Sequence, residues 1–226
     1  MSLNKSKGNM YPWVDFTWNP IRGKCPHQCV YCFMKSRDVG PLRLEEKALA
    51  DNLGSGRTIF VGSSTDMWAA AVPDEWIFRV LKRCNEHPNK YIFQSKNPAR
   101  FFHFSANFPA TFARTILGTT LESNREYGQS VYAPPAWARA ACFLHLRPFK
   151  KMVSIEPIIA FDHMVFLKWL REIKPAFVSI GADSKGHGLE EPTAIELDNF
   201  VVALRDITEV KLKKNLARLM LEHNDQ

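Results

Sequence analysis

Three cysteines lie close together near the start of the chain, in the stretch Cys25-Pro26-His27-Gln28-Cys29-Val30-Tyr31-Cys32. Their spacing, C-x3-C-x2-C, places three thiolates in one turn-rich loop, and thiolates favour zinc and iron–sulfur clusters over hard cations. Structural zinc sites usually take four ligands, typically from two separated pairs, and no second pair follows here. The stretch therefore predicts a 4Fe-4S cluster held by Cys25, Cys29 and Cys32, with its fourth iron open to another ligand.

Two other interpretations of these cysteines stay open. A zinc site completed by His27 would be strained, because His27 lies between the first two cysteines in the same tight loop. A redox-active C-x-x-C pair of Cys29 and Cys32 would leave Cys25 unexplained, and thioredoxin-like pairs open a helix in a βαβ unit. The zinc interpretation predicts zinc in the purified protein, whereas the cluster predicts brown, oxygen-sensitive material.

The composition is that of a globular protein. The chain has 226 residues, of which 46% are hydrophobic and 12% aromatic, so we expect a single domain over residues 1–226. No apolar run approaches the roughly 20 residues of a membrane span, and Met1–Met10 lacks the apolar stretch of a signal peptide. With five cysteines, three of them clustered, we expect a cytoplasmic protein. The net charge of +7 permits attraction to phosphates.

Short apolar segments alternate with helical patterns along the chain. We expect strands at 13–18, 58–61, 91–93, 115–118, 152–155 and 177–180. Helices are predicted at 44–53, from 73 onward, at 98–104 and 135–147, and around 166–173 and 197–204. This alternation predicts an α/β fold, an open partial (β/α)6 barrel with parallel strands, because a closed eight-stranded barrel typically needs about 250 residues.

Some elements carry more specific expectations. The core should cover about residues 11–206, followed by a basic C-terminal extension, 207–226. Within that extension Glu209–Leu221 has a helical pattern, which predicts a solvated helix face or, as the alternative, a phosphate-binding patch. In the helix 135–147 we expect Trp137 to face inward and Cys142 to be a buried thiol, and Cys84 should be buried in the helix after residue 73.

Polar residues follow the predicted strands at their carboxyl ends, where parallel α/β barrels place their functional side chains. They are Asp66, Gln94, Lys96, Thr119, Thr120, Glu122, Glu156 and Asp183. Taken singly, any of them could be a cap or a loop residue. Together they predict one rim that binds a polar ligand with amine, carboxylate and ribose groups.

The cysteine motif, with aromatic Tyr31 directly before its last cysteine, resembles the radical S-adenosylmethionine (SAM) superfamily. The resemblance implies that Cys25, Cys29 and Cys32 hold the cluster and that the amino and carboxylate groups of SAM bind its open iron. It also implies that the backbone at Tyr31 meets the adenine. The chemistry implied is reductive cleavage of SAM to a 5′-deoxyadenosyl radical, which abstracts a hydrogen from a substrate.

The same resemblance implies further contacts. Where the superfamily has a Gly-Gly-Glu-like motif, this chain has Gly62-Ser63-Ser64-Thr65-Asp66, so Ser63 and Ser64 are our candidates for the SAM amino group. The other implied SAM contacts are Thr119 or Glu122 at the ribose, Glu156 near the ribose or the substrate, and Gly181 along the adenine. The candidate catalytic residues are Lys96, Asp66 and Glu156, while Trp18 and Trp68 could stack on a base or pack in the core.

Further segments resemble a phage-associated radical SAM family of unassigned function. They are Trp18-Asn19-Pro20, Ser64-Thr65-Asp66-Met67, Val72-Pro73-Asp74-Glu75, Ser154-Ile155-Glu156-Pro157 and Ile180-Gly181-Ala182-Asp183, and the resemblance spans roughly Tyr11–Asp206. This resemblance implies a stand-alone catalytic domain, in the host cytoplasm if phage-encoded.

Together with the positive charge, the phage resemblance favours a nucleic-acid base or a nucleotide as substrate, in modification or repair. A peptide or small metabolite is the alternative substrate. A non-catalytic, metal-stabilised nucleic-acid-binding module is the alternative of another class. The radical chemistry implies a one-electron donor such as a flavodoxin or ferredoxin, with DNA or a nucleotide as substrate and no membrane.

Overall fold

The computed structural model describes residues 3–8 and 10–220. In this part of the chain one sheet has eight strands in the order β1-β2-β5-β6-β7-β8-β9-β10. Their bounds are β1 (Leu3–Lys5), β2 (Phe16–Trp18), β5 (Thr58–Val61), β6 (Lys90–Ser95), β7 (Thr115–Thr120), β8 (Lys150–Ile155), β9 (Phe177–Ile180) and β10 (Glu209–Leu212). A separate hairpin pairs β3 (Ile21–Arg22) with β4 (Arg43–Leu44).

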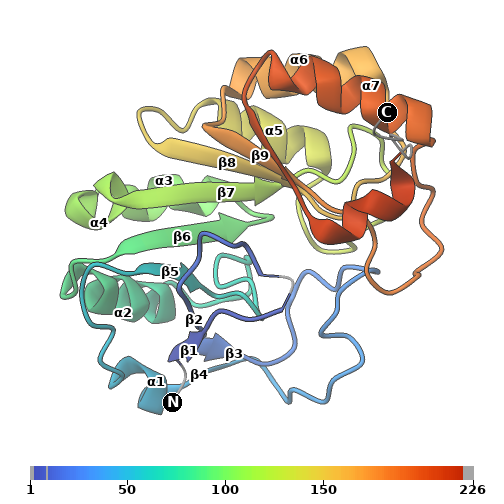
Figure 1. Cartoon of the computed structure of the whole chain (residues 1–226). Coiled ribbons are helices and arrows are strands. Elements are labelled where there is room, and N and C mark those ends of the chain that lie inside the picture. Colours follow the sequence, from blue (N-terminus) through green and yellow to red (C-terminus); the bar gives the residue numbers. More distant parts are fainter. Residues whose placement is uncertain (1–2, 9, 221–226) are drawn as a thin grey trace.

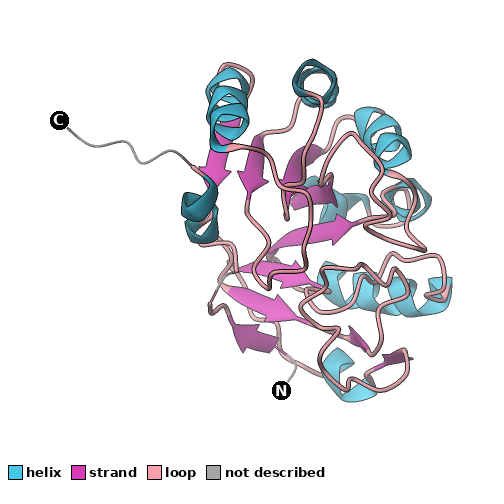
Figure 2. Ribbon diagram, turned by 90° about the vertical axis from the view of Figure 1, so that its right-hand side faces the viewer, coloured by secondary structure: helices cyan, strands magenta, loops and turns pink. Residues whose placement is uncertain are grey.

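Helices connect the strands. They are α1 (Glu46–Leu49), α2 (Asp74–Asn85), α3 (Ala99–Ser105), α4 (Pro109–Ala113), α5 (Ala136–Leu144), α6 (His163–Ile173) and α7 (Ala194–Arg205), followed by the 3₁₀ helix η1 (Lys214–Leu219). Within the eight-stranded sheet of the described residues, β2 and β5 to β10 pair in parallel, and β1 joins antiparallel, against β2. Helices α2 to α7 lie along the outer face of the curved sheet (Figure 1; Figure 2). The prediction of an α/β fold with an open partial barrel is confirmed. The predicted six parallel strands correspond to β2 and β5 to β9, and the sheet also contains the antiparallel β1 and the parallel β10, which were not predicted.

The C-terminal prediction was wrong. Glu209–Leu221, expected as an amphipathic helix, contains the strand β10 and the 3₁₀ helix η1, and its last residue lies outside the described part of the chain, as does the rest of the predicted extension. Strand β10 pairs in register with β9, for example Lys211 with Ser179. Val210 and Leu212 alternate with lysines, a pattern that fits a strand as well as a helix. The edge of β9 offers hydrogen bonds to a strand, and this decides for the strand.

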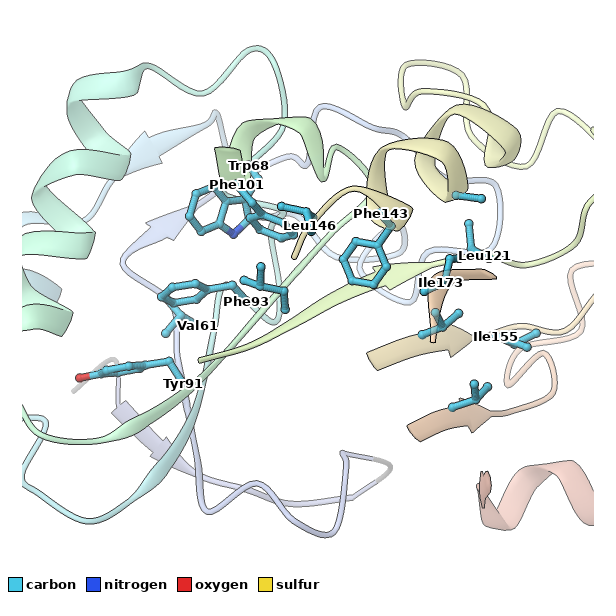
Figure 3. Close-up of a cluster of buried hydrophobic side chains, with 14 of the residues drawn as sticks. Val61, Trp68, Tyr91, Phe93, Phe101, Leu121, Phe143, Leu146, Ile155 and Ile173 are labelled. Carbon is cyan, nitrogen blue, oxygen red and sulfur yellow. The ribbon is translucent and has the colours of Figure 1, made fainter. Parts of the chain in front are cut away.

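The apolar residues of the strands sort onto the two faces of the sheet with a period of two. The outer face packs against the helices in the larger core, part of which Figure 3 shows around Trp68, Phe93 and Phe101. The inner face packs against the N-terminal segment in a smaller core, which contains Tyr11, Val14, Phe60, Ile92, Met152 and Phe177. The N-terminal segment therefore fills the inside of the barrel.

Tryptophan and cysteine placements differ in part from expectation. Trp18 and Trp68 are fully buried, and Trp68 sits in a cluster of phenylalanines, so both belong to the core and not to a stacking surface. Trp137, predicted to face inward, is 60% exposed, because Ala136, Arg139 and Ala140 occupy the inner side of α5. Cys84 is buried as predicted, and Cys142 is half-buried. None of the helices in residues 3–8 and 10–220 is long and apolar enough to cross a membrane.

Candidate active site

The cysteine loop lies just beyond the carboxyl end of β2. It is part of a long excursion of the chain, residues 22–43, and the pairing of β3 with β4 closes the base of this excursion. Turn-type backbone bonds shape it: the Gln28 amide donates to the Cys25 carbonyl (3.4 Å) and the Cys32 amide to the Cys29 carbonyl (3.2 Å). Gln28 adopts a positive φ of 49° to make the first turn. A single β-bridge between Cys29 and Ser130 joins the loop to the segment after β7.

His27 fixes the middle of this loop. Its side chain is only 2% exposed, and its Nε2 lies 2.9 Å from Asp66 Oδ2, while Nδ1 lies 3.4 Å from the Tyr132 carbonyl. Both ring nitrogens are thus occupied by oxygens of this chain. The zinc interpretation required one of them to bind metal, so this arrangement favours a positioning role for His27.

Asp66 is saturated with hydrogen bonds. Besides His27, its carboxylate accepts from the Ser95 hydroxyl and the backbone amides of Lys96 and Trp68, each at 2.9 Å. Burial acts to raise the pKa of this carboxyl, but the bonds from His27 and the amides outweigh burial and lower it. Asp66 is therefore an ionised group that joins the cysteine loop to the ends of β5 and β6.

The three thiols of the loop suit a cluster in number and chemistry. Cys29 is buried, whereas Cys25 and Cys32 are half-buried, and burial followed by the charge of Asp66 raises the pKa of Cys25 to about 11. Within the described residues, no three His, Cys, Asp or Glu side chains are placed to hold a metal ion. A cluster is held through separate iron atoms, one thiolate each, so its ligands need not meet at one point. The donor set of three thiols in one loop, with the Lys96 ammonium nearby, fits an anionic iron–sulfur cluster.

A buried ionic network lies beside the loop. Glu122, which is fully buried, forms ion pairs with Arg139 (Nη2 to Oε2, 2.9 Å) and Lys96 (Nζ to Oε1, 3.5 Å), and accepts a short hydrogen bond from the Tyr31 hydroxyl. Burial alone would raise the pKa of Glu122, but the charges of Arg139 and Lys96 lower it to about 2. Burial likewise acts to lower the pKa of Lys96, and negative charge at Cys29 and Glu122 raises it. The Lys96 ammonium also lies 5.3 Å from the centre of the Tyr31 ring.

Asn19 organises the loop after β5. Its Oδ1 accepts from the Ser64 amide and hydroxyl, both at 3.0 Å, and its Nδ2 donates to the Ser63 hydroxyl at 3.2 Å. Gly62 begins this loop with a φ of 79°, a region that favours glycine. The two serines are therefore held at the rim near the cysteine loop. The Thr65 hydroxyl links the segment after β5 to the start of the cysteine loop by donating to the Gly23 carbonyl (2.9 Å).

The inside of the barrel carries a second polar group. The buried Tyr11 hydroxyl lies 3.0 Å from Gln94 Oε1 and 3.1 Å from Ser154 Oγ, and Gln94 Nε2 donates to the Thr120 hydroxyl at 3.2 Å. The two-residue period of β7 places Thr119 on the outer face, where its hydroxyl donates to the Ser95 carbonyl (2.8 Å) and is fully buried. The structure thus brings Thr120, and not the predicted Thr119, to the inside.

Glu156 meets the C-terminal strand at the same end of the barrel. Its Oε2 lies 2.7 Å from Lys213 Nζ, and its Oε1 accepts from the Ser179 hydroxyl at 2.7 Å. A Cβ built on Gly181 would lie 3.2 to 3.3 Å from side-chain atoms of Lys213, Asn215 and Glu156, so this glycine lets the three side chains approach closely. Lys213, expected on a solvated face, is instead part of the rim.

The Asp183 carboxylate accepts hydrogen bonds from residues of its own loop. Its Oδ1 accepts from the Lys185 amide (3.1 Å) and lies 2.7 Å from His187 Nδ1, and its Oδ2 accepts from the His187 amide. Burial acts to raise the pKa of Asp183, and the His187 bonds lower it. This is the pattern of a loop-stabilising aspartate.

The rim residues thus form two groups: one around the cysteine loop and one around Glu156 and Lys213. Sequence reasoning missed Asn19, Arg139, Tyr11 and Lys213. Only Asn19 had a local signal, because Asn before proline favours a turn. The other three reach the site through packing of distant segments.

Known proteins resemble this chain in fold and not in sequence. No family model and no curated protein matches this sequence. Among solved structures, a cysteine-to-serine mutant of spore photoproduct lyase has a TM-score of 0.65 at 9% identity, covering 91% of this chain and 78% of that chain. A double mutant of the same enzyme, with bound AdoMet and dinucleoside spore photoproduct, has a TM-score of 0.63 at 9% identity, with the same coverage.

A second similar structure is that of Streptococcus suis SuiB bound to the precursor peptide SuiA, with a TM-score of 0.57 and 11% identity. That match covers 90% of this chain and 49% of SuiB. Spore photoproduct lyase and SuiB are radical SAM enzymes. The chain therefore shares the partial-barrel fold of these radical SAM enzymes.

Proposed function

We propose that this protein is a radical SAM enzyme that acts on a nucleic-acid base or a nucleotide, in modification or repair. The observation that carries the proposal is the position of the C-x3-C-x2-C loop, which follows the first parallel strand of the barrel on the rim where the other polar strand ends meet. The fold shared with an AdoMet-bound spore photoproduct lyase supports it.

Cys25, Cys29 and Cys32 would hold a 4Fe-4S cluster. When bound, the reduced cluster and SAM supply a 5′-deoxyadenosyl radical, which abstracts a hydrogen from the substrate. The protein's own task is to hold the loop and exclude water. Asp66 and His27 are in place to fix the loop.

Other side chains would contact SAM or the substrate. Ser63 and Ser64, presented by Asn19, are the proposed partners of the SAM amino group, and Tyr31 and Gly181 those of the adenine. For the ribose we propose Thr120 in place of Thr119, because only Thr120 lies on the inner face of β7. Glu156 lies at the same rim as a ribose or substrate contact.

Two of the expected contacts take an indirect role in this proposal. The Glu122 carboxylate is buried beneath Tyr31 and would position Tyr31 and Lys96 without touching the ribose. Asp66 has four donors of this chain around it and would act through His27. Lys96, at 12% side-chain exposure, is the proposed contact for a phosphate or carboxylate of the substrate.

The substrate class has support from charge and from likeness. The chain carries a net charge of +7, and one spore photoproduct lyase structure is complexed with a dinucleoside spore photoproduct. A peptide is the second candidate, because SuiB was solved with a precursor peptide. The proposal includes a one-electron donor such as a flavodoxin or ferredoxin, in the cytoplasm.

The test is anaerobic reconstitution with iron and sulfide, reduction with dithionite in the presence of SAM, and measurement of 5′-deoxyadenosine by liquid chromatography and mass spectrometry. The wild type should form it and Cys29→Ala should not. Cys142→Ala is the matched control, since Cys142 is a half-buried cysteine outside the loop. A wild type that binds zinc and forms no deoxyadenosine would refute the enzyme and leave a metal-stabilised binding module.

A further inference from the structure

The excursion that carries the cysteines is also rich in basic residues. Residues 22–43 contain Arg22, Lys24, Lys35, Arg37 and Arg43 but only one acidic residue, Asp38. Lys24, Lys35 and Arg37 are exposed, and in the part of the chain that the structure describes none of the three forms an ion pair. The segment runs as an extended loop away from the sheet (Figure 1). It therefore presents uncompensated positive charge next to the cysteines.

Two arginines face each other at the base of this excursion. In the β3–β4 hairpin Arg22 is the direct cross-strand partner of Arg43. Like charges placed directly opposite in a two-stranded ladder repel each other. Arg43 is relieved in part by Glu45, at 3.6 Å, whereas Arg22 makes one side-chain hydrogen bond within residues 3–8 and 10–220, from Nε to the Asn19 carbonyl (3.0 Å). Such a pair is a site for an anion that both guanidinium groups can share.

A cavity opens at the same place. It has a volume of about 500 Å³, and its lining contains both arginines and one acidic residue, Asp38. The other lining residues are Asn19, Gly23, Met34, Val39, Gly40, Ser64 and Thr65. Its wall depends on Gly23, whose φ of 107° and close approach to the Pro41 carbonyl leave no room for a side chain. The volume falls in the range of small-ligand sites, roughly 300–1,000 Å³. Ser64 connects the cavity to the proposed SAM site.

Two exposed aromatic side chains belong to the cysteine loop and to a segment bonded to it. Phe33, directly after Cys32, is 52% exposed, and Tyr132 is 64% exposed. Tyr132 is held beside the loop, because its amide donates to the His27 carbonyl at 3.4 Å. Aromatic rings next to a basic groove are the usual means of binding single-stranded nucleic acid, with bases stacked on the rings and phosphates on the cations.

We propose that the cavity between Arg22 and Arg43 binds a backbone phosphate of a single-stranded nucleic acid whose bases stack on Tyr132 and Phe33, so that the strand crosses the cysteine loop. The inference rests on the proposed function in taking this strand as the substrate. An acidic electron-donor protein is the competing occupant. The charges alone suit both, and the cavity lined by two guanidinium groups favours the phosphate.

The experiment measures the affinity of the full chain for a fluorescent single-stranded DNA oligonucleotide by anisotropy, over a series of salt concentrations. The double variant R22Q/R43Q should weaken binding and reduce the slope of log K against log salt by about 0.7, because the two arginines share one phosphate contact. Tyr132→Ala should weaken binding roughly 5- to 100-fold with an unchanged slope, because stacking carries no counterions. Lys168→Gln on α6 and Phe102→Ala on α3 are the matched controls and should bind as the wild type does.

Stability separates binding from a structural role. R22Q/R43Q removes a repulsion, but it also removes the hydrogen bonds from Arg22 to the Asn19 carbonyl and from Arg43 to the Val39 and Pro41 carbonyls. We therefore expect its unfolding midpoint in urea to stay close to that of the wild type. The inference would be overturned if R22Q/R43Q bound DNA with the affinity and the salt slope of the wild type. It would also be overturned if R22Q/R43Q bound DNA normally but were no longer reduced by flavodoxin, because the surface would then bind the electron donor. The assay needs no cluster, so a wild type that binds DNA with the expected slope but makes no deoxyadenosine would refute only the enzyme.

Discussion

His27 Nε2 lies 2.9 Å from Asp66 Oδ2, and this contact ties the cysteine loop to the end of β5. The two side chains are 2% and 12% exposed, so the contact is shielded from water. The same Asp66 oxygen accepts from the Ser95 hydroxyl and the Lys96 amide, which extends the tie to β6. One carboxylate thus sets the position of the loop relative to two strand ends.

Asp66→Asn should therefore destabilise the protein by about 2–4 kcal/mol, because a neutral amide cannot accept from all four donors and leaves buried donors unpaired. The measurement is urea unfolding at neutral pH. Asp162→Asn is the control, since Asp162 forms an exposed ion pair with Arg125 and its loss should cost far less. Equal losses in the free energy of unfolding for the two variants would show that the Asp66 hydrogen bonds are not formed.

A second readout separates positioning from stability. In reconstituted protein, Asp66→Asn should also change the electron paramagnetic resonance signal of the reduced cluster, whereas Asp162→Asn should leave it unchanged. Asp66→Glu, which keeps the charge, should restore part of the wild-type signal. An unaltered signal in Asp66→Asn would remove the residue from the site.

Glu122→Gln should reveal a stability term that depends on pH. Because the pKa of Glu122 falls from an ordinary value of 4.5 to about 2 on folding, its ionisation stabilises the folded state fully above about 4.5. That stability is lost as the pH falls toward 2, and the shift corresponds to about 3 kcal/mol. The wild type should thus lose its advantage over the variant as the pH falls from about 4.5 toward 2.

Urea unfolding of both proteins over this pH range is the measurement. Glu86→Gln, which breaks an exposed pair with Arg83, is the control and should show a much weaker pH dependence. A difference between wild type and Glu122→Gln that stays constant with pH would contradict the buried network.

The strands that are buried on both faces could be predicted from the sequence. Thr58–Val61 and Phe177–Ile180 read as apolar runs, and they are strands β5 and β9 as predicted. Strand β10 could not be found in this way, because a half-exposed edge strand with alternating lysines also fits a helix. Whether this segment forms a strand is set by its hydrogen bonds to the edge of β9, and these join segments that are distant in sequence.

The site was predictable only at the level of strand ends. The rule that function follows the carboxyl ends of parallel strands indicated Glu122 and Glu156, but not what they contact. Arg139 and Lys213 reach them from α5 and from the segment after β10, far away in sequence. The choice between Thr119 and Thr120 needed the exact end of β7, since a shift of one residue changes the face.

Lys213 and Glu156 should be energetically coupled. Their atoms lie 2.7 Å apart at 13% and 18% side-chain exposure, so removing one partner leaves a poorly hydrated charge. In a double-mutant cycle of Lys213→Met and Glu156→Gln, we expect a coupling of about 1–2 kcal/mol in the free energy of unfolding. The pair Lys211 and Glu209 on the more exposed edge is the control and should couple less. A coupling near zero would place Lys213 in solvent, as the helical pattern had suggested.

Gly23→Ala should disrupt the base of the cysteine loop. An added Cβ would overlap the Pro41 carbonyl oxygen, in backbone that also has a φ of 107°. The chain must move apart there, and we expect a loss of about 3 kcal/mol or more in the free energy of unfolding, together with poor iron incorporation. Gly128→Ala is the matched control, because Gly128 has a φ of 64° with no atom within 4 Å of the added Cβ, which leaves only the backbone cost of about 1–2 kcal/mol. If the two alanine variants were equally stable, the contact between Gly23 and Pro41 would not exist in solution, and the cavity beside Arg22 would lose its wall.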